Sequence, residues 1–497
     1  MFEYNHVILN IIQILAALLI FVLGLGILVI IGMYIADISQ TTHAIRKNYP
    51  VVGRFRYLFE HMGEFLRQYF FAQDREEMPF NRAQRSWVYR SAKDIDTTVA
   101  FGSTRSLKGS GTIMFANCPF PTLGKDAVKP QLLTIGENCK KPYTTASLFN
   151  ISGMSFGAIS RPAVLSNGAR MSGAWMNTGE GGLSPYHLEG GADLIFQIGT
   201  AKYGVRDKEG KLSDEKLMEA AAHEQVKMFE IKLSQGAKPG KGGILPGAKV
   251  TEQIAKIRGI EVGQDSISPN RHTDINNIDE LLKMIMRVRK VTGKPVGFKT
   301  VIGAYGWIEN LFEEINKRGS DFAPDFITID SADGGTGAAP MSLMDYMGMP
   351  LSESLPLVVD MLDKYQLRDR VKVICSGKLV NPAEAAWALC MGADFIVSAR
   401  GPMFALGCIQ ALQCNKNTCP TGITTHHKKL QRGLNPKHKA QRVKNYINHM
   451  VYEIGVISHS CGVREPRELK RFHCRAVIEN GKSKSMQEIY PDYSNEV

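Results

Sequence analysis

The longest apolar run in the chain extends from Ile14 to Ala36 and contains no charged residue. As an α-helix it would be about 35 Å long, enough to cross a bilayer core of about 30 Å. A core helix would need only an apolar stripe. A secretory signal would begin with Lys or Arg, whereas the residues before this run include Glu3 and neither basic residue. The pattern predicts one membrane-spanning helix, about 14–36, within an anchor segment 1–40.

A basic segment follows this run. Residues 41–110 carry twelve Lys and Arg against seven Asp and Glu. Basic flanks mark the cytoplasmic side of a span, so we expect a single-pass membrane protein with its catalytic body in the cytoplasm. We assign residues 41–144 to a basic, helical lead-in. One helix face in it is apolar and consists of Leu58, Met62, Phe65, Leu66 and Tyr69. This face suits the membrane surface or the surface of the catalytic body, and both interpretations stay open.

From about residue 145 onward, short apolar or β-branched runs alternate with longer helical patterns, which predicts parallel βα units. Eight candidate strands can be counted, and eight such units favour an α/β fold of the (β/α)8 (TIM) barrel type. The expected strands are Leu148–Ile151, Gly173–Met176, Leu194–Ile198, Met228–Leu233, Val296–Thr300, Phe326–Asp330, Val371–Cys375 and Phe395–Ser398. We therefore expect a barrel over residues 145–460 and a C-terminal tail over 461–497.

Glycine-rich or polar motifs begin where almost every one of these strands ends. Examples are SGMSFG at 152–157, NTGEGG at 177–182 and SADGGTG at 331–337. Barrel active sites are built from these C-terminal loops. The loops after the seventh and eighth strands are a common phosphate site, and here they contain Ser376, Gly377 and Lys378, then Ala399 and Arg400.

Cys408, Cys414 and Cys419 lie within a dozen residues, in ALGCIQALQCNKNTCPTG. Three thiolates suit an iron–sulfur cluster with three irons better than a tetrahedral zinc site, which takes four ligands. Three buried free thiols, or zinc completed by His426 or His427, are the alternatives that spacing leaves open. A phosphate site beside a redox cluster points to FMN.

The net charge of +12 does not indicate a nucleic-acid partner, because the chain has no nucleic-acid-binding motif and much of the excess lies in 41–110. Its nine cysteines are scattered rather than arranged as a disulfide framework, which favours a reducing compartment.

Several motifs occur in an order that is typical of one family. They are SGMSFGAIS (152–160), NTGEGG (177–182), KLSQGAKPGKGGILPGAKV (232–250), ISPNRHTDI (267–275), DGGTGA (333–338) and ALGCIQALQCNKNTCPTGITT (405–425). With these motifs, residues 145–460 resemble the FMN-binding synthase domain of glutamate synthases. The resemblance implies FMN and a [3Fe-4S] cluster held by the three cysteines. It also implies reduction of 2-iminoglutarate, formed from 2-oxoglutarate and ammonia, to L-glutamate.

The resemblance also implies roles for individual residues. Glu180 and Lys238 would be catalytic, and Lys238, Arg258 and Asn277 would bind the substrate. Lys299 would face the flavin ring and stabilise its reduced form. The implied FMN-binding residues are Ser152, Met154, Ser155, Lys299, Asp333, Gly334, Gly335, Ser376, Gly377, Lys378, Ala399 and Arg400.

The substrate pocket departs from the family pattern. Ile244 stands where the family has a Gln that contacts 2-oxoglutarate, and Asn277 aligns with a family Ser. Losing a hydrogen-bonding partner lowers the preference for the original acid, so the substrate is expected to be 2-oxoglutarate or a related imino or keto acid. The chain contains no glutaminase segment and no G-x-G-x-x-G fingerprint. We therefore expect electrons to be exchanged with another protein or a membrane carrier.

Three functions follow. The first is a membrane-anchored FMN and iron–sulfur oxidoreductase of the glutamate synthase type. The second is the same fold acting as an amino- or hydroxy-acid dehydrogenase that passes electrons to a membrane carrier. The third is a non-catalytic electron-transfer subunit. Glu180, Lys238 and Arg258 argue against the third, because an electron-transfer subunit needs no site for a substrate carboxylate.

Overall fold

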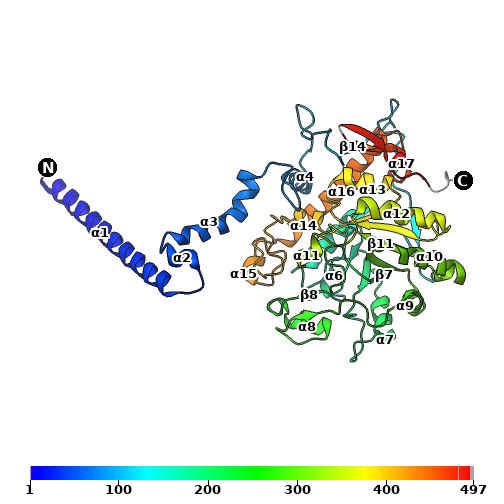
Figure 1. The fold of residues 1–497 in the computed structure, drawn as a ribbon, viewed down its shortest axis with the longest axis horizontal. Helices are drawn as coiled ribbons and strands as arrows, with labels where there is room; N and C mark the ends of the chain where they lie inside the picture. Colours follow the sequence, from blue (N-terminus) through cyan, green and yellow to red (C-terminus); the bar gives the residue numbers. More distant parts are fainter. Residues whose placement is uncertain (1, 480, 493–497) are drawn as a thin grey trace. The chain divides into compact units, whose positions relative to one another are not determined.

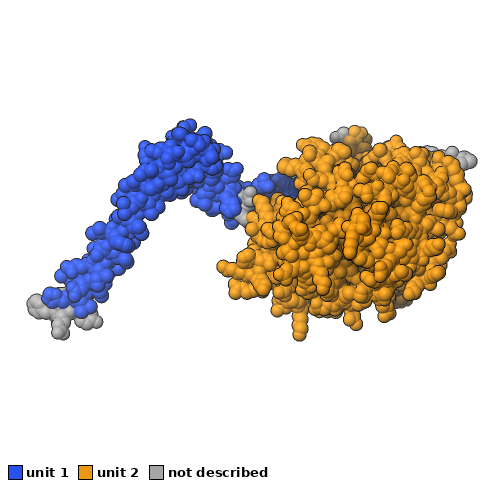
Figure 2. All heavy atoms as spheres, turned by 90° about the horizontal axis from the view of Figure 1, so that it is seen from below, with its two compact units in different colours: residues 1–82 blue, residues 83–497 orange. Residues whose placement is uncertain are grey.

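The computed structural model describes residues 2–479 and 481–492. The chain divides into two compact units, residues 1–82 and 83–497, which are coloured separately in Figure 2. The predicted lead-in 41–144 is thus divided between them. The reason is α4 (Arg82–Ala92), which packs on the barrel unit. In this helix Val88 and Ala92 are buried, and the indole of Trp87 donates to Glu453 at 3.3 Å.

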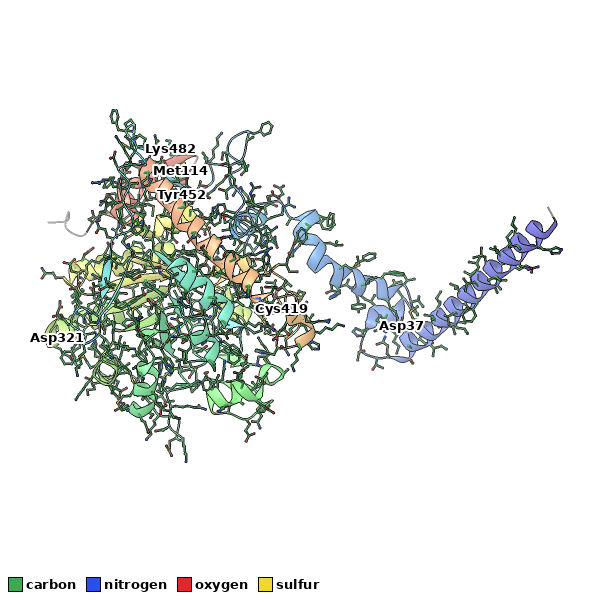
Figure 3. The ribbon with its side chains drawn as sticks, turned by 180° about the vertical axis from the view of Figure 1, so that it is seen from behind. Asp37, Met114, Asp321, Cys419, Tyr452 and Lys482 are labelled. Carbon is green, nitrogen blue, oxygen red and sulfur yellow. The ribbon has the colours of Figure 1, made fainter. Side chains whose placement is uncertain are left out.

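The first unit consists of α1 (Phe2–Ser39), α2 (Ala44–Asn48), α3 (Gly53–Leu66) and the short π-helix η1 (Arg67–Phe71). The predicted span lies inside α1 (Figure 1). The most apolar 18-residue stretch within His6–Ser39 has a mean hydropathy of 3.3 and none of it is buried, so this helix is long and apolar enough to cross a membrane. Asp37 near its end is labelled in Figure 3. Its buried carboxylate lies 2.8 Å from the guanidinium groups of both Arg46 and Arg54.

The second unit is built on the predicted barrel, which is confirmed. Eight parallel strands close in the order β10-β11-β12-β13-β4-β5-β6-β7. Every predicted strand is present, with bounds that move by a few residues. The strands are β4 (Phe149–Ile151), β5 (Met176–Asn177), β6 (Leu194–Ile198), β7 (Val226–Lys232), β10 (Val296–Val301), β11 (Phe326–Asp330), β12 (Lys372–Ser376) and β13 (Phe395–Ser398). The second strand begins later than predicted because Gly173 adopts a left-handed conformation that ends the preceding helix.

Helices follow the strands along the chain. They include α5 (Pro162–Ser172), α7 (Asp214–Ala222), α9 (Ile278–Thr292), α10 (Gly306–Arg318), α12 (Leu351–Lys364), α13 (Pro382–Cys390), α14 (Arg400–Leu406) and the long α16 (Pro436–Ser460). In α9, Leu281, Leu282, Ile285 and Val288 form a buried stripe that faces the barrel.

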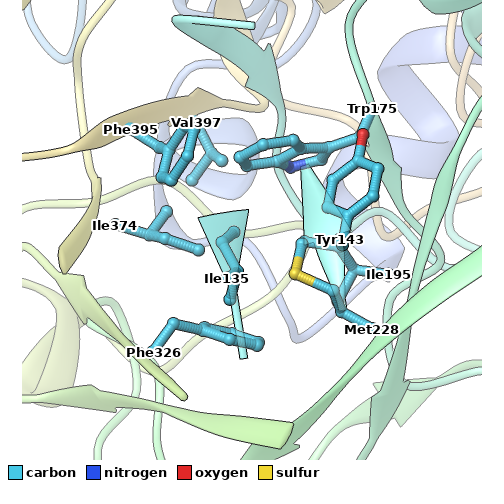
Figure 4. Packing of buried hydrophobic residues seen from close by; sticks show 9 residues of the cluster. All are labelled: Ile135, Tyr143, Trp175, Ile195, Met228, Phe326, Ile374, Phe395 and Val397. Carbon is cyan, nitrogen blue, oxygen red and sulfur yellow. The ribbon is translucent and has the colours of Figure 1, made fainter. Parts of the chain in front are cut away.

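A hairpin closes the N-terminal end of the barrel. It is formed by β2 (Leu133–Ile135) and β3 (Tyr143–Thr145). Figure 4 shows Ile135 and Tyr143 packed among residues at or near the strand starts, namely Trp175, Ile195, Met228, Phe326, Ile374, Phe395 and Val397. Since this end is filled with apolar side chains, a ligand can enter the barrel only from the opposite, C-terminal end.

The C-terminal tail is folded rather than extended. Strands β14 (Cys474–Glu479) and β15 (Lys482–Ser485) pair with each other, and β14 also pairs with β1 (Ile113–Phe115) from the lead-in. The lead-in and tail therefore form one three-stranded antiparallel sheet, which is followed by α17 (Met486–Ile489).

Candidate functional site

Two adjoining clefts open at the C-terminal ends of the barrel strands. The larger encloses about 990 Å³ of empty space including its mouth, and the smaller about 530 Å³. Both are lined by Gly153, Gln197, Lys232, Gln235, Gly335, Ala399 and Arg400, so they form one continuous site. Of the residues predicted to act on cofactor or substrate, Met154, Ser155, Glu180, Lys238 and Arg258 line the larger cleft. Ser152, Lys299, Ser376, Gly377 and Lys378 line the smaller cleft.

Glu180 and Lys232 form an ion pair in the larger cleft. The Lys232 ammonium donates to Glu180 Oε1 at 3.0 Å and to Gln235 Oε1 at 2.8 Å. Burial raises the pKa of Glu180, but Lys232 and Lys238 outweigh it and the net pKa lies below its usual range. Gly243 leaves room for this carboxylate, because a Cβ there would lie 2.7 Å from Glu180 Oε1. The site thus holds an ionised carboxylate beside an ammonium group.

Lys238 lies in the loop after β7 and is 7% exposed. Within the described residues its ammonium has no hydrogen-bond or ion-pair partner. Burial lowers the pKa of Lys238, and the nearby carboxylate of Glu180 opposes this effect. A buried, unpartnered cation in a cleft favours an anionic ligand, since its charge is otherwise uncompensated.

Arg258, the last residue of α8 (Glu252–Arg258), turns inward to the same cleft. Its guanidinium donates to Ser266 Oγ at 3.0 Å and to the Phe156 carbonyl at 3.1 Å, and it lies over the ring of Tyr203. Its Nε atom is buried without a hydrogen-bond partner. Arg258 is therefore held in place by these contacts, and its Nε–H donor has no hydrogen-bond acceptor.

The smaller cleft is polar and rich in cations. Lys232, Lys299, Lys378 and Arg400 line it together with the hydroxyl groups of Ser152, Ser376 and Ser398 and one acidic residue, Asp330. Lys299 lies 3.4 Å from Asp330 Oδ1. The Lys378 ammonium lies 3.3 Å from the Asp333 carboxylate. Asp333 and its neighbour Gly334, both predicted to bind the cofactor, line neither cleft. This donor set fits a phosphorylated, anionic cofactor such as FMN.

A buried carboxylate lines a small separate cavity, which shares Ser152 and Lys299 with this cleft. Glu230, on β7, is 2% exposed. It accepts hydrogen bonds from Asn177 Nδ2 at 2.8 Å, Gln197 Nε2 at 2.6 Å and Thr328 Oγ1 at 2.6 Å. These groups come from four strands, so the network ties the barrel interior together beneath the site. The sequence patterns gave no role to Lys232, although it opens the motif 232–250, and did not indicate this network. Polar residues inside otherwise apolar strands, as in MFEIK and LIFQI, were the available signal.

The three clustered cysteines lie beside the larger cleft, which Cys414 lines (Cys419 is labelled in Figure 3). Arg400 lines both clefts, and its guanidinium lies 3.8 Å from Cys414 Sγ. Burial raises the pKa of Cys408 to about 11, and Arg400 opposes the shift. Burial also disfavours the Cys419 thiolate, but hydrogen bonds from Thr421 and Thr424 bring its pKa below the ordinary value.

In the described part of the chain, no group of three or more His, Cys, Asp or Glu side chains is arranged to hold a single metal ion. The zinc alternative gains no support: His426 Nε2 lies 3.0 Å from the Gly157 carbonyl, and its ring packs edge-on against Phe156. Three thiols leave a tetrahedral zinc ion one ligand short, so the cysteine loop suits an iron–sulfur cluster with three irons better.

Lys249 anchors the cysteine loop to the barrel. Its buried ammonium donates to the carbonyl groups of Ala158 at 3.0 Å and Cys414 at 3.2 Å. The loop itself bends sharply, since Gln410, Leu412 and Asn417 all have positive φ angles. A loop conformation that these residues seldom adopt is held in place by such anchors.

Asn277 lies away from the site. Its exposed side chain caps α9 by accepting from the Glu280 backbone N–H at 3.0 Å. Asn277 is thus outside the lining of both clefts and serves as a helix N-cap, and the substrate role that the resemblance implied stays a prediction. Ile244 does line the larger cleft, on the short strand β8 (Ile244–Leu245), and its side chain is 38% exposed.

Comparisons with known proteins give a consistent result. A family model described as "conserved region in glutamate synthase" matches residues 121–464. The chain is 39% identical over 512 residues to the glutamate synthase large subunit-like protein YerD of Bacillus subtilis (strain 168), and the match covers 94% of this chain and 97% of that protein. It is 35% identical over 321 residues to the archaeal-type glutamate synthase (NADPH) of Thermotoga neapolitana. That match covers 64% of this chain and 60% of that protein, so the chain spans less than two thirds of its length.

Among solved structures, a mandelate oxidase mutant with an FMN adduct aligns with a TM-score of 0.44 at 13% identity, covering 87% of this chain and 99% of that one. A flavocytochrome b2 mutant with sulfite bound aligns with a TM-score of 0.44 at 14% identity, covering 86% and 87%. The family match covers more than half of the chain and spans the barrel, both clefts and the cysteine loop. On this basis the chain belongs to the glutamate synthase family.

Proposed function

We propose that this chain is a membrane-anchored oxidoreductase of the glutamate synthase type that uses FMN and a [3Fe-4S] cluster to reduce an imino or keto acid. The observation that carries the proposal is that one cleft is lined by the Glu180–Lys232 pair, the unpartnered Lys238 and Cys414. An anion site, a proton-transfer group and a thiol loop beside one cavity are the parts that such a reaction needs.

Lys238 and the Nε atom of Arg258 would hold the substrate carboxylate, because both are buried donors without a partner for their charge or proton. Glu180 would relay the proton that the reaction consumes. Reduction of a C=N bond to an amine adds one hydride, which carries both electrons, to carbon and one proton to nitrogen. Lys232, 3.0 Å from Glu180, would keep that carboxylate ionised between turnovers.

Lys378, Arg400 and the hydroxyl groups of Ser376 and Ser398 would hold the phosphate of FMN, and Lys299 would lie against its ring. FMN, when bound, supplies hydride to the substrate. Cys408, Cys414 and Cys419 would hold the cluster. Arg400 contacts Cys414 and lines both clefts, so its side chain would lie next to both FMN and the cluster.

The electrons would come from an external protein or a membrane carrier. The helix α1 would anchor the chain, and the basic residues after it would keep the barrel on the cytoplasmic side.

The first test is anaerobic purification of the full chain, with its absorption spectrum, FMN content and iron content, followed by turnover of 2-oxoglutarate plus ammonia under reducing conditions. We expect bound FMN, about three irons per chain and glutamate formation. A colourless protein without FMN and iron would contradict the proposal. Flavin reduction by an amino or hydroxy acid, without glutamate formation, would instead favour the dehydrogenase.

Glu180→Gln separates catalysis from electron transfer. We expect it to abolish imine reduction while FMN and iron are retained, because the amide cannot relay the proton. Glu224→Gln, a change of the same kind at an exposed position, is the matched control and should have full activity. Unchanged substrate turnover in Glu180→Gln would favour a non-catalytic electron-transfer subunit.

Ile244 favours a second substrate. Its side chain, with Leu245 and Pro246, makes one wall of the cleft apolar. A second carboxylate placed against this wall would lose its hydration without gaining a partner. A monocarboxylic 2-oxo or 2-imino acid with an apolar side chain fits better. A panel of 2-oxo acids with ammonia tests this, and Ile244→Gln should shift the preference toward 2-oxoglutarate by about tenfold.

A further inference from the structure

The helix that follows the anchor presents an apolar stripe to its surroundings. On α3, Phe55, Phe59 and Met62 recur at helical spacing and are 53%, 63% and 39% exposed. The stripe continues into η1, where Phe70 and Phe71 are 74% and 75% exposed. Contiguous apolar side chains of this size mark a binding surface, because exposure to water is unfavourable.

Cationic side chains border this stripe. At 100° per residue, Arg54 lies at one edge of the stripe, and Arg56 and Arg67 lie at the other. Arg56 and Arg67 are exposed and form no ion pair with any residue that the structure describes. An apolar face edged by arginines is typical of helices that lie in the headgroup layer of a membrane.

A buried ion-pair cluster fixes the start of this helix to the end of the anchor. Asp37 directly follows the apolar run that ends at Ala36, and its carboxylate is fully buried. It accepts from Arg54 of α3, from Arg46 of α2 and from the Val51 backbone N–H at 3.0 Å. When α1 spans a bilayer, Asp37 stands at the membrane surface. Arg54 and the beginning of α3 must then stand at the same level.

We propose that α3 and η1 lie in the headgroup layer of an anionic bilayer, with the apolar stripe toward the acyl chains and the arginines toward lipid phosphates. The inference rests on the proposed membrane anchoring by α1. Charge complementarity and continuity with the anchor favour lipid as the occupant of the stripe over a second copy of the chain or the catalytic unit.

Tryptophan fluorescence can test the orientation of the helix. The four tryptophans lie at positions 87, 175, 307 and 387, so residues 1–82 contain none. Full-length Phe59→Trp reports the stripe, and Glu60→Trp on the opposite face is the matched control. Both are placed in nanodiscs of phosphatidylglycerol with brominated acyl chains, and the parent emission is subtracted. We expect bromine to quench the added emission of Phe59→Trp about twofold more strongly than that of Glu60→Trp.

Equal quenching in the two variants, or no quenching in either, would overturn the proposal and would point to a protein surface as the occupant. In nanodiscs of phosphatidylcholine alone, which carry no net negative charge, the difference in quenching between the two variants should become smaller. An unchanged difference would refute the proposed binding of the arginines to anionic lipid. Alkaline carbonate extraction of membranes tests the anchor separately. A chain that is extracted would refute the anchoring. If the chain stays in the membrane after carbonate treatment but the two variants are quenched equally, only the proposed orientation of α3 is refuted.

Discussion

Replacing Glu230 tests whether the buried network next to the smaller cleft stabilises the barrel. In Glu230→Ala, the donors of Asn177, Gln197 and Thr328 lose their acceptor inside the protein. An unsatisfied buried donor costs about 1–3 kcal/mol, so the loss of unfolding free energy should be about 4–6 kcal/mol after partial relaxation. In Glu230→Gln, the amide oxygen can keep the bonds to Asn177 and Gln197, and the amide nitrogen can donate to the Thr328 hydroxyl. The loss should then be about 1–2 kcal/mol.

Scanning calorimetry of the purified protein measures the difference. With an unfolding entropy of about 2 cal/mol/K per residue and about 400 residues in the barrel unit, 1 kcal/mol corresponds to about 1 °C in Tm. We expect Tm to fall by about 5 °C in Glu230→Ala and by about 1–2 °C in Glu230→Gln. The FMN content should fall in the same order, because Gln197 lines both clefts. Equal destabilisation by the two substitutions, or none by Glu230→Ala, would refute the argument from unsatisfied donors.

Three further outcomes are expected. The pKa of Lys238 is lowered, mainly by burial, so its charge is present at low pH and is lost as pH rises. The KM for an anionic substrate should therefore increase at alkaline pH. In Lys238→Arg the pH profile of KM should lose this rise, because arginine stays charged. Asn277→Ala should cost about 1 kcal/mol of stability through loss of the cap and leave KM unchanged, and a raised KM would restore the substrate role. Cys414→Ser should lower the iron content while FMN is retained, and unchanged iron would exclude Cys414 as a ligand.

The barrel was predictable because its pattern is local. Each strand is a short apolar run, and each active-site motif begins where a strand ends, so Glu180 and Lys378 could be assigned to the correct end of the barrel from sequence. The Glu180–Lys232 pair was not predictable, since it joins side chains from two different βα units. Such a contact depends on strand register and loop conformation, which spacing along the chain does not specify.

Asn277 shows the opposite case. Its substrate role rests on an aligned motif and stays a prediction, whereas its capping role has a local signal. Asn277 is followed three residues later by Glu280, at the start of an apolar helical pattern, as is typical of a helix N-terminus. The packing of α4 on the barrel unit was not predictable from local sequence either, because it depends on contacts with Glu453 and Tyr446, more than 350 residues away along the chain.

The hairpin of β2 and β3 has a kinetic consequence. With one end of the barrel plugged by Ile135 and Tyr143, a small reductant that must touch the cofactor has to use the same mouth as the organic acid. Such a dye should compete with the acid for the mouth, so a high concentration of the acid should inhibit reduction by the dye. A donor protein that delivers electrons at the thiol loop leaves the mouth open, so the acid should not inhibit this donor competitively.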